Sequence, residues 1–179
     1  KSSYARTNQN VLSNFPLGNF VNDIVVDDNG IVISGTSSGV YQSTDGGDNW
    51  EAINTGLTSS YIYQLALGPS AGKENLTELF AAVLGGGVYK YDRIANTWIA
   101  YVTGLTTLYV YSLAFNSAGD LFAGTDIGLF VYLAAASAWN QLNVPTLTTL
   151  FIAAILINNL DHIFLAEDWG GIHRSTDGG

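Results

Sequence analysis

Residues 39–50 read GVYQSTDGGDNW, and this stretch organises the chain. A short β-branched and aromatic segment runs into a Gly-rich acidic turn, and a tryptophan follows. The first part of the stretch returns as GIHRSTDGG at residues 171–179, and weaker copies lie between, GVYKYDRIANTW at 87–98 and GLFVYLAAASAW at 128–139. One structural unit has therefore been laid down four times, and this repeat has to be counted before the chain length is interpreted.

The spacing of the copies gives the length of the unit. Aligned on the first predicted strand, the copies start 41, 48 and 42 residues apart, at Val21, Ile62, Val110 and Ile152. The longer middle step contains a polar, turn-forming insertion, GPSAGKENLTE at residues 68–78. A period near 42 residues with about four short strands per unit is typical of a β-propeller blade. We therefore predict an all-β fold, a single β-propeller domain over residues 1–179.

Each unit is predicted to be a four-stranded antiparallel blade, with strands a to d in chain order. The blade units are residues 21–61, 62–109, 110–151 and 152–179, and residues 1–20 are the end of a preceding or ring-closing blade. In the first unit we place the strands at Val21–Val26, Ile31–Gly35, Gly39–Ser43 and Trp50–Asn54. The last unit lacks strand d. Either Asn10–Ser13 supplies that strand and closes a four-bladed ring, which removes two exposed sheet edges, or the chain is a slice of a larger propeller.

Composition excludes several classes of function. Six Lys and Arg face fifteen Asp and Glu, a net charge of −9, which argues against nucleic acid and anionic membranes as partners. Cysteine is absent, so the chain has no disulfide framework, no thiolate zinc site and no cysteine nucleophile. The longest apolar run, residues 150–157, is too short to cross a bilayer. We predict no membrane insertion and no cofactor, and the oligomeric state stays open.

The turn at the centre of the repeat resembles a known motif. Ser43, Asp45, Gly47 and Trp50 form Ser-x-Asp-x-Gly-x-x-Trp, which resembles the Asp-box, or BNR repeat, of sialidase-like propellers. The resemblance extends to the propeller repeats of photosystem II assembly factors and implies an exported, bacterial protein, extracellular or periplasmic. The residues to which the resemblance gives a structural role in the turn are Ser43, Asp45, Gly47, Trp50, Ser175, Asp177 and Gly179.

Physical chemistry favours a structural role for this motif. The carboxylate of Asp45 can accept N–H bonds across its own turn, whereas Trp50 can bury a large apolar body, which contributes more than one hydrogen bond. This order explains why Trp98 and Trp139 persist in copies whose acidic turn has decayed. The two histidines, His162 and His173, lack a spaced set of metal ligands, and we predict no metal site.

A ligand face is predicted from the blade topology. The a–b and c–d turns lie on one face of a propeller, and the d–a links and b–c loops lie on the other, which the family resemblance implies is the ligand face. An aromatic residue recurs in every d–a link, either as a wedge between blades or as a platform for a sugar or peptide. The predicted ligand-binding residues are Tyr61, Tyr109, Phe151, Asp126, Asp168 and Trp169.

These features predict a non-catalytic domain that binds a protein or glycan. The alternative is a glycoside hydrolase, xyloglucanase-like or sialidase-like, of which this chain would be only a part. Glycoside hydrolysis needs two carboxylates at a set separation, and the available acids are Asp23, Asp126, Glu167 and Asp168. Of these, Asp126 and Asp168 are weak catalytic candidates. Sialidases resembling this family bind their substrate with three arginines. The only arginines here are Arg6, Arg93 and Arg174, which makes sialidase activity an unfavoured reading.

Overall fold

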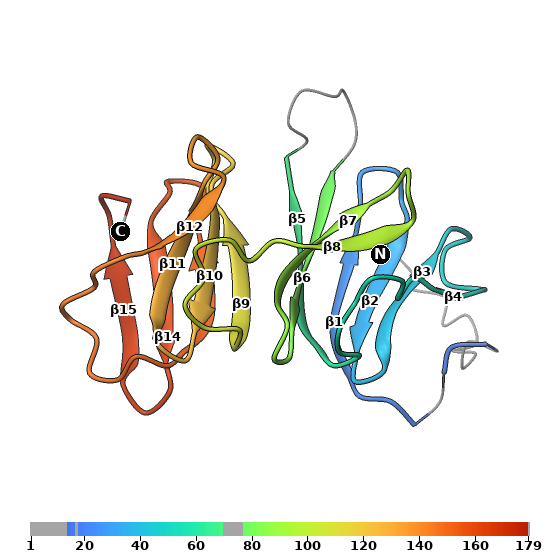
Figure 1. The fold of residues 1–179 in the computed structure, drawn as a ribbon, viewed down its shortest axis with the longest axis horizontal. Helices are drawn as coiled ribbons and strands as arrows, with labels where there is room; N and C mark the ends of the chain where they lie inside the picture. Colours follow the sequence, from blue (N-terminus) through green and yellow to red (C-terminus); the bar gives the residue numbers. More distant parts are fainter. Residues whose placement is uncertain (1–13, 17, 70–76, 179) are drawn as a thin grey trace, which may run out of the picture.

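The computed structural model describes residues 14–16, 18–69 and 77–178, and all of its strands belong to four antiparallel sheets (Figure 1). These sheets are the blades of a β-propeller, as the repeat predicts. Blade 1 contains β1 (Val21–Val26), β2 (Val32–Thr36), β3 (Gly39–Ser43) and β4 (Glu51–Ala52). Blade 2 contains β5 (Ile62–Gly68), β6 (Glu78–Val83), β7 (Gly87–Asp92) and β8 (Thr97–Ala100). Blade 3 contains β9 (Val110–Phe115), β10 (Leu121–Thr125), β11 (Gly128–Leu133) and β12 (Ala138–Gln141). Blade 4 contains β13 (Ile152–Ile157), β14 (Ile163–Glu167) and β15 (Gly171–Ser175).

The strand boundaries predicted for the first unit can be compared with the strands of blade 1 in the structure. Strands β1 and β3 have the predicted residues, and β2 begins and ends one residue later than predicted. The prediction for strand d was wrong in length, since only Glu51–Ala52 forms a ladder. One backbone bond continues past Ala52, from Ile53 N to Val40 O at 2.9 Å, and side-chain hydrogen bonds flank the strand at both ends. Trp50 N donates to Asn14 Oδ1 at 3.0 Å, and Val40 N donates to Asn54 Oδ1 at 2.7 Å.

The hydrophobic core lies between the blades. Three clusters of buried residues join blade 1 to blade 2, blade 2 to blade 3, and blade 3 to blade 4. Strands β6 and β10 are buried along nearly their whole length because a blade covers each of their faces. Representative partners across the three interfaces are Ile33 with Leu65, Val88 with Trp139, and Leu129 with Leu165.

Glycine allows the blades to approach closely. A Cβ on Gly35 would lie 2.9 Å from Ile62 Cγ2, and one on Gly124 would lie 2.7 Å from Ile152 Cγ2. In both cases strand b of one blade faces the start of strand a of the next. The small residues near the end of strand b therefore have the packing role that the sequence indicates.

A repeated hydrogen bond also joins neighbouring blades. In each case a polar side chain of strand a accepts the backbone N–H of strand a in the next blade. The three bonds run from Leu65 N to Asp23 Oδ2 at 2.8 Å, from Leu113 N to Gln64 Oε1 at 2.6 Å, and from Ile155 N to Ser112 Oγ at 2.9 Å. The corresponding residue of blade 4 is Ala154, whose side chain has no acceptor, so this series ends at the last blade.

The two end blades each expose an apolar face. Ile24 and Val26 of β1 are exposed, as are Leu156 of β13 and Ile172 of β15. Figure 1 shows blades 1 and 4 at opposite ends of the row of sheets. The segment Asn10–Ser13, proposed above as a ring-closing strand, lies outside the described residues.

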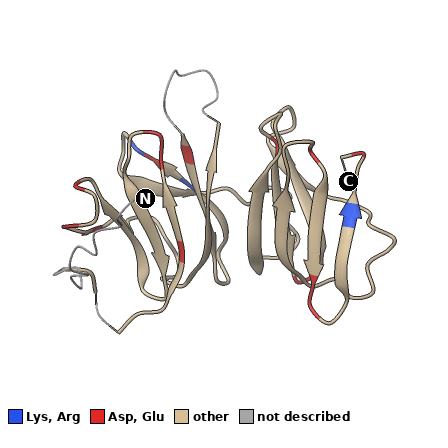
Figure 2. Cartoon of the chain, turned by 180° about the vertical axis from the view of Figure 1, so that it is seen from behind, with Lys and Arg blue, Asp and Glu red and all other residues tan. Residues whose placement is uncertain are grey.

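The a–b and c–d turns share one face of the molecule. Arg93 in the c–d turn of blade 2 forms an ion pair with Asp27 in the a–b turn of blade 1, with Nη2 and Oδ2 2.9 Å apart. Ser117 N in the a–b turn of blade 3 donates to Asp161 Oδ1 in that of blade 4 at 2.8 Å. Figure 2 shows most of the acidic residues at turns and strand ends, so the net negative charge is carried by the rims of the sheets.

The Ser43–Trp50 turn is held by its own side chains. Asp45 accepts from Ser43 Oγ at 2.8 Å and from Asn49 N at 2.9 Å, and Gly47 N donates to Ser43 Oγ at 2.9 Å. The side-chain bond from Asn49, followed by its backbone bond and the bond from Ser43, lowers the pKa of Asp45 to about 2. The second acidic turn repeats one contact, since Ser175 Oγ donates to Asp177 Oδ1 at 2.6 Å. Gly179 lies outside the described residues.

Candidate functional site

The d–a links and b–c loops come together on one face through a hydrogen bond that recurs in every blade. The first residue of each b–c loop donates its backbone N–H to the carbonyl of the aromatic residue in the preceding d–a link. The four bonds are Ser37 N to Phe20 O at 2.9 Å, Leu84 N to Tyr61 O at 2.9 Å, Asp126 N to Tyr109 O at 3.3 Å and Asp168 N to Phe151 O at 3.0 Å. The backbone therefore places each predicted acid beside a predicted aromatic.

An aromatic row crosses this face over blades 2, 3 and 4. Ring centroids are 5.1 Å apart for Tyr61 and Tyr63, 4.9 Å for Tyr63 and Tyr111, and 4.4 Å for Tyr111 and Phe151. The contacts of Tyr63 with Tyr111 and of Tyr111 with Phe151 cross from one blade to the next and stabilise the blade interfaces, whereas the half-buried Tyr61 contacts Tyr63 of its own blade. Tyr109 stands apart from these pairs and is 49% exposed. Among the predicted aromatics, Tyr109 therefore offers the more accessible surface.

Two members of this row, Tyr63 and Tyr111, were missed by the sequence analysis. They lie in β5 and β9, two residues after Tyr61 and Tyr109, and the repeated pattern Tyr-x-Tyr at both positions could have identified them. Burial, followed by the neighbouring Tyr61 hydroxyl, raises the pKa of Tyr63, and burial, followed by Tyr63 and Asp126, raises that of Tyr111. Both phenols therefore stay protonated at neutral pH and keep their hydrogen-bond donors.

The acids of this region have different partners. Asp126 Oδ1 accepts from Thr107 Oγ1 at 2.7 Å, while Asp168 is exposed. Both carboxylate oxygens of Asp23 accept backbone hydrogen bonds. Oδ2 accepts from Leu65 N, and Oδ1 accepts from Ile24 N at 2.8 Å. The structure thus ties Asp23 into the blade interface and leaves Asp168 open to solvent.

Glu167 forms a buried polar cluster at the end of β14. It accepts from Thr149 N, from Thr148 Oγ1 at 3.0 Å, and pairs with His173 Nε2 at 2.8 Å. Burial alone raises the pKa of Glu167, but the bonds from Thr148, Thr149 and His173 outweigh it and lower the pKa to about 2. These hydrogen bonds join the last d–a link to the sheet of blade 4. Glu167 is therefore a structural partner of His173.

Trp169 is the most unusual residue of the face. Its side chain is 96% exposed, and its backbone φ is +65°, a left-handed conformation that costs a non-glycine residue about 1–2 kcal/mol. It follows Asp168 in the β14–β15 loop. Among the described residues this exposed indole adds little to packing, and its left-handed backbone makes the loop a candidate for contact with another molecule.

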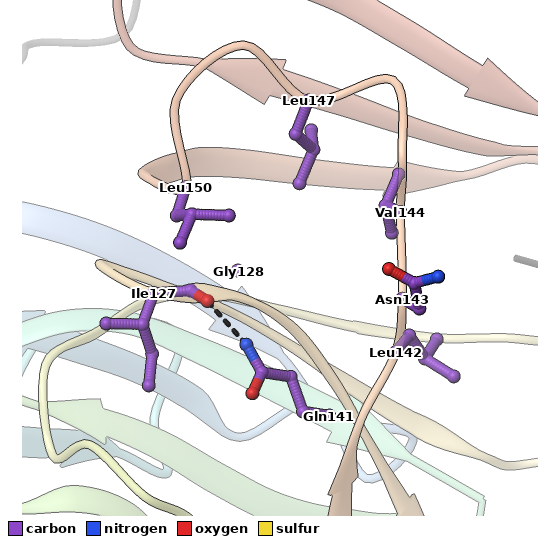
Figure 3. Close-up of a pocket in the computed structure, with 8 residues that line it drawn as sticks. All are labelled: Ile127, Gly128, Gln141, Leu142, Asn143, Val144, Leu147 and Leu150. Atoms are coloured by element: carbon purple, nitrogen blue, oxygen red, sulfur yellow. Dashed lines mark hydrogen bonds between the residues drawn. The ribbon is translucent and has the colours of Figure 1, made fainter.

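A pocket of about 300 Å³ lies on the same face, between the edge of blade 3 and the link that leads to blade 4 (Figure 3). The start of β11 and the end of β12 form one wall, where Gln141 Nε2 donates to Ile127 O at 2.6 Å. The d–a link forms the other wall, with Leu147 and Leu150 pointing from the link toward the opposite wall (Figure 3). Walls that combine apolar side chains with the amides of Gln141 and Asn143 suit a small segment of a ligand. Sequence reasoning missed this pocket because it depends on the path of the link.

Two further observations concern metal ligands and membrane-spanning helices among the described residues. In the parts of the chain that the structure describes, no three His, Asp or Glu side chains gather in a way that could hold a metal ion. The same parts contain no helix with the length and hydropathy that crossing a membrane demands.

Among the comparisons with known proteins, the one with solved structures supports the fold. No family model matches the chain, and no curated protein does either. Among solved structures, the chain is similar to the extracellular domain of BT4673 from B. thetaiotaomicron, with 21% identity, a TM-score of 0.73 and coverage of 91% of this chain and 24% of that one. The extracellular domain of BT3049 from the same organism gives 16% identity, a TM-score of 0.74 and coverage of 89% and 24%.

An ancestral GH74 enzyme is similar to a comparable degree. Its identity is 23%, its TM-score is 0.68, and the match covers 90% of this chain and 23% of that enzyme. The chain is a β-propeller. It spans about a quarter of the length of these structures, and identities this low establish the shared fold alone.

Proposed function

We propose that this chain is a non-catalytic binding or scaffold domain of an exported bacterial protein, which presents its d–a links and b–c loops to a protein or glycan ligand. The observation that carries the proposal is the exposed, backbone-strained indole of Trp169, beside the exposed carboxylate of Asp168. An aromatic face beside a carboxylate suits the hydroxyls of a sugar ring or the polar groups of a peptide.

The neighbouring residues extend this site toward blade 3. Tyr109 offers a half-exposed ring, Asp126 lies beside it through the backbone bond, and the pocket next to Leu150 supplies a hollow of mixed polarity. The ligand would therefore contact the blade 3 and blade 4 end of the face, while the ring contacts of Tyr111 with Tyr63 and Phe151 hold the blades beneath it. The extracellular location of the similar domains supports an exported protein, extracellular or periplasmic.

The runner-up is a glycoside hydrolase, and the similarity to GH74 enzymes is the observation that favours it. In that case the chain would contribute only part of the catalytic site, because Asp23 and Glu167 are engaged in structural hydrogen bonds. The acids that remain are Asp126 and Asp168. Their carboxylates would have to act with a second group outside this chain.

A glycan array and a hydrolysis assay on the same purified domain separate the two functions. We expect saturable binding to a glycan or, where the array is silent, to a protein partner, with no turnover of aryl glycosides. In the binding assay, Trp169→Ala should weaken the ligand at least about tenfold, because a stacked indole is a typical hot spot. Ile94→Ala is the matched control, an 86% exposed apolar residue on the opposite, turn face.

The hydrolysis arm decides the remaining question. Turnover of aryl glycosides that disappears in Asp126→Asn or Asp168→Asn would overturn the non-catalytic reading and establish the runner-up. Equal loss of binding in Trp169→Ala and Ile94→Ala would overturn the assignment of the face.

A further inference from the structure

The b–c loop of blade 4, which carries Trp169, has the same backbone form as the b–c loop of blade 2. In each loop the first residue donates to the aromatic residue of the preceding link, and the third donates to the last residue of strand b. These bonds are Leu84 N to Tyr61 O at 2.9 Å and Gly86 N to Val83 O at 3.0 Å in blade 2, and Asp168 N to Phe151 O at 3.0 Å and Gly170 N to Glu167 O at 3.3 Å in blade 4. The residue between them is Gly85 or Trp169, and φ is +65° for both.

This likeness explains why the indole of Trp169 is exposed. Blade 2 packs against blade 1 on one face and blade 3 on the other, and a Cβ on Gly85 would still have no atom within 4 Å. The position is therefore open to solvent even in a blade that is covered on both faces. A glycine would adopt this backbone conformation without strain, so the indole of Trp169 destabilises the turn relative to glycine and projects into water.

The charged side chains of this face are acidic throughout the part of the chain that the structure describes. In the d–a links and b–c loops they are Asp126 and Asp168. The described basic residues lie in strand c or in the c–d turn, and they are Lys90, Arg93 and Arg174. Figure 2 shows red but no blue at the lower ends of the sheets, where the b–c loops lie. The face therefore favours a cationic ligand through charge complementarity.

The pocket at the start of β11 differs from the corresponding space in blade 2. A Cβ on Gly87, at the start of β7, would lie 2.8 Å from Val102 Cγ1, so the link fills this space in blade 2. A Cβ on Gly128 would meet only Gln141 Nε2 among the described atoms, at 3.3 Å. The link after blade 3 covers residues 142–151, one residue more than the link over residues 101–109 after blade 2. The longer link stands away from β11 and leaves the pocket open.

Leu150 joins this pocket to the exposed loop of blade 4. It lines the pocket and is 54% exposed. The next residue, Phe151, accepts the backbone N–H of Asp168, and the preceding residue, Thr149, donates its Oγ1 to Asp168 O at 3.2 Å. The pocket, the carboxylate of Asp168 and the indole of Trp169 therefore follow one another across the face.

We propose that the ligand of this face is a polypeptide segment with a lysine or arginine side chain that lies on the indole of Trp169 and pairs with Asp168. An apolar side chain of the same segment enters the pocket beside Leu150. The inference rests on the proposed function and names the class of its ligand. Among aromatic side chains tryptophan binds cations best, and a carboxylate next to it adds Coulomb attraction.

The charges and the pocket favour a polypeptide over a glycan. A neutral glycan would use Asp168 only as a hydrogen-bond acceptor, and an acidic glycan would be repelled by Asp126 and Asp168. A polypeptide carries a cation and an apolar side chain on one chain. The side-chain amides of Gln141 and Asn143 at the pocket can pair with its peptide groups.

An NMR titration of the full chain with blocked alanine peptides tests the proposal. Each peptide contains one lysine and one leucine, separated by one, two or three residues. We expect the indole N–H signal of Trp169 to shift saturably, with the signals of Trp98 and Trp139 unchanged. Norleucine in place of lysine keeps the aliphatic chain without the charge and should weaken binding at least about tenfold. Alanine in place of leucine should weaken it about three- to tenfold.

Variants of the protein supply a second arm. Asp168→Asn should weaken the lysine peptide about two- to fivefold, and Asp168→Lys should make a glutamate peptide bind tighter than the lysine peptide. Asp48→Asn is the matched control, since it removes the same charge from an exposed residue of a c–d turn on the opposite face. Trp169→Gly should abolish binding, followed by the backbone amide of Gly170, without lowering the urea midpoint of unfolding, because glycine accepts a φ of +65°.

The outcomes separate this proposal from the proposed function. Equal binding of the lysine and norleucine peptides, or equal effects of Asp168→Asn and Asp48→Asn, would overturn the proposal. Lysine amide that binds as tightly as the peptides would assign the site to a small organic cation and overturn it as well. Glycan binding that depends on Trp169, without peptide binding, would overturn the polypeptide ligand and leave the proposed function in place. A face that binds neither peptides nor glycans nor a protein would refute both.

Discussion

Replacing Trp98 by alanine should destabilise the fold more than any change in the acidic turns. The Trp98 side chain is buried between blades 1 and 2, its Nε1 donates to Ile53 O at 2.6 Å, and its backbone N donates to Thr55 O at 2.8 Å. It also contacts Tyr91 at a centroid distance of 5.0 Å. The side chain therefore joins two blades through both apolar contact and a hydrogen bond.

The expected cost follows from these contacts. Removing a buried tryptophan side chain costs about 3–5 kcal/mol, because the surrounding structure closes the cavity only in part. Trp98→Phe keeps most of the apolar contact but leaves the carbonyl of Ile53 without its donor, which costs about 1–3 kcal/mol. Trp50 is only half-buried, and its Nε1 donates within its own turn to Gly47 O at 3.0 Å. Trp50→Ala should therefore cost about 1–2 kcal/mol, since less apolar surface is lost.

Urea unfolding, followed by circular dichroism and by fluorescence, measures these differences. The free energies of unfolding should fall in the order wild type, Trp50→Ala, Trp98→Ala, with Trp98→Phe less affected than Trp98→Ala. The two probes should agree, since separate transitions would mean that blades unfold one by one. If Trp98→Ala cost less than Trp50→Ala, the reasoning that indoles anchor the blade interfaces would be wrong.

Two further predictions address single contacts. Because the pKa of Glu167 is lowered in the folded state, its contribution to stability is present above its ordinary pKa of 4.5 and is lost as the pH falls toward about 2. Glu167→Gln should therefore flatten the pH dependence of the unfolding midpoint between these two values. An unchanged slope would contradict the cluster with His173. Gly124→Ala should cost about 1–3 kcal/mol by thermal or urea unfolding, because the new methyl group would meet Ile152 Cγ2 at 2.7 Å. Combining it with Ile152→Ala should cost less than the sum of the two, and strict additivity would show that this contact is not the cause.

The fold could be predicted from the sequence because the same local pattern of strands and turns occurs four times along the chain. The alternation of short strands and turns located β1 and β3, and the recurring tryptophans located strand d. The length of β4 could not be predicted, because side-chain hydrogen bonds flank it, from Trp50 N to Asn14 Oδ1 and from Val40 N to Asn54 Oδ1. Side chains that compete with the backbone for hydrogen bonds leave no periodic signal.

The candidate site was predictable only in part. Backbone topology places Asp126 beside Tyr109 and Asp168 beside Phe151, and this follows from the order of strands in a blade. The engagement of Glu167 depends on three partners from two different elements, and the pocket at Leu147 depends on the path of one link. Contacts of this kind arise between blades, and local sequence patterns do not encode them.

Hydrogen exchange of the four indole N–H groups, followed by NMR, tests the central claim most directly. The account predicts that the Nε1 protons of Trp98 and Trp139, bonded to carbonyls of the preceding blades, exchange slowest, that Trp50 is intermediate, and that Trp169 exchanges at nearly the rate of a free indole. Similar rates for all four, or protection of Trp169 above that of Trp98 and Trp139, would contradict a propeller whose blades are joined by buried tryptophans.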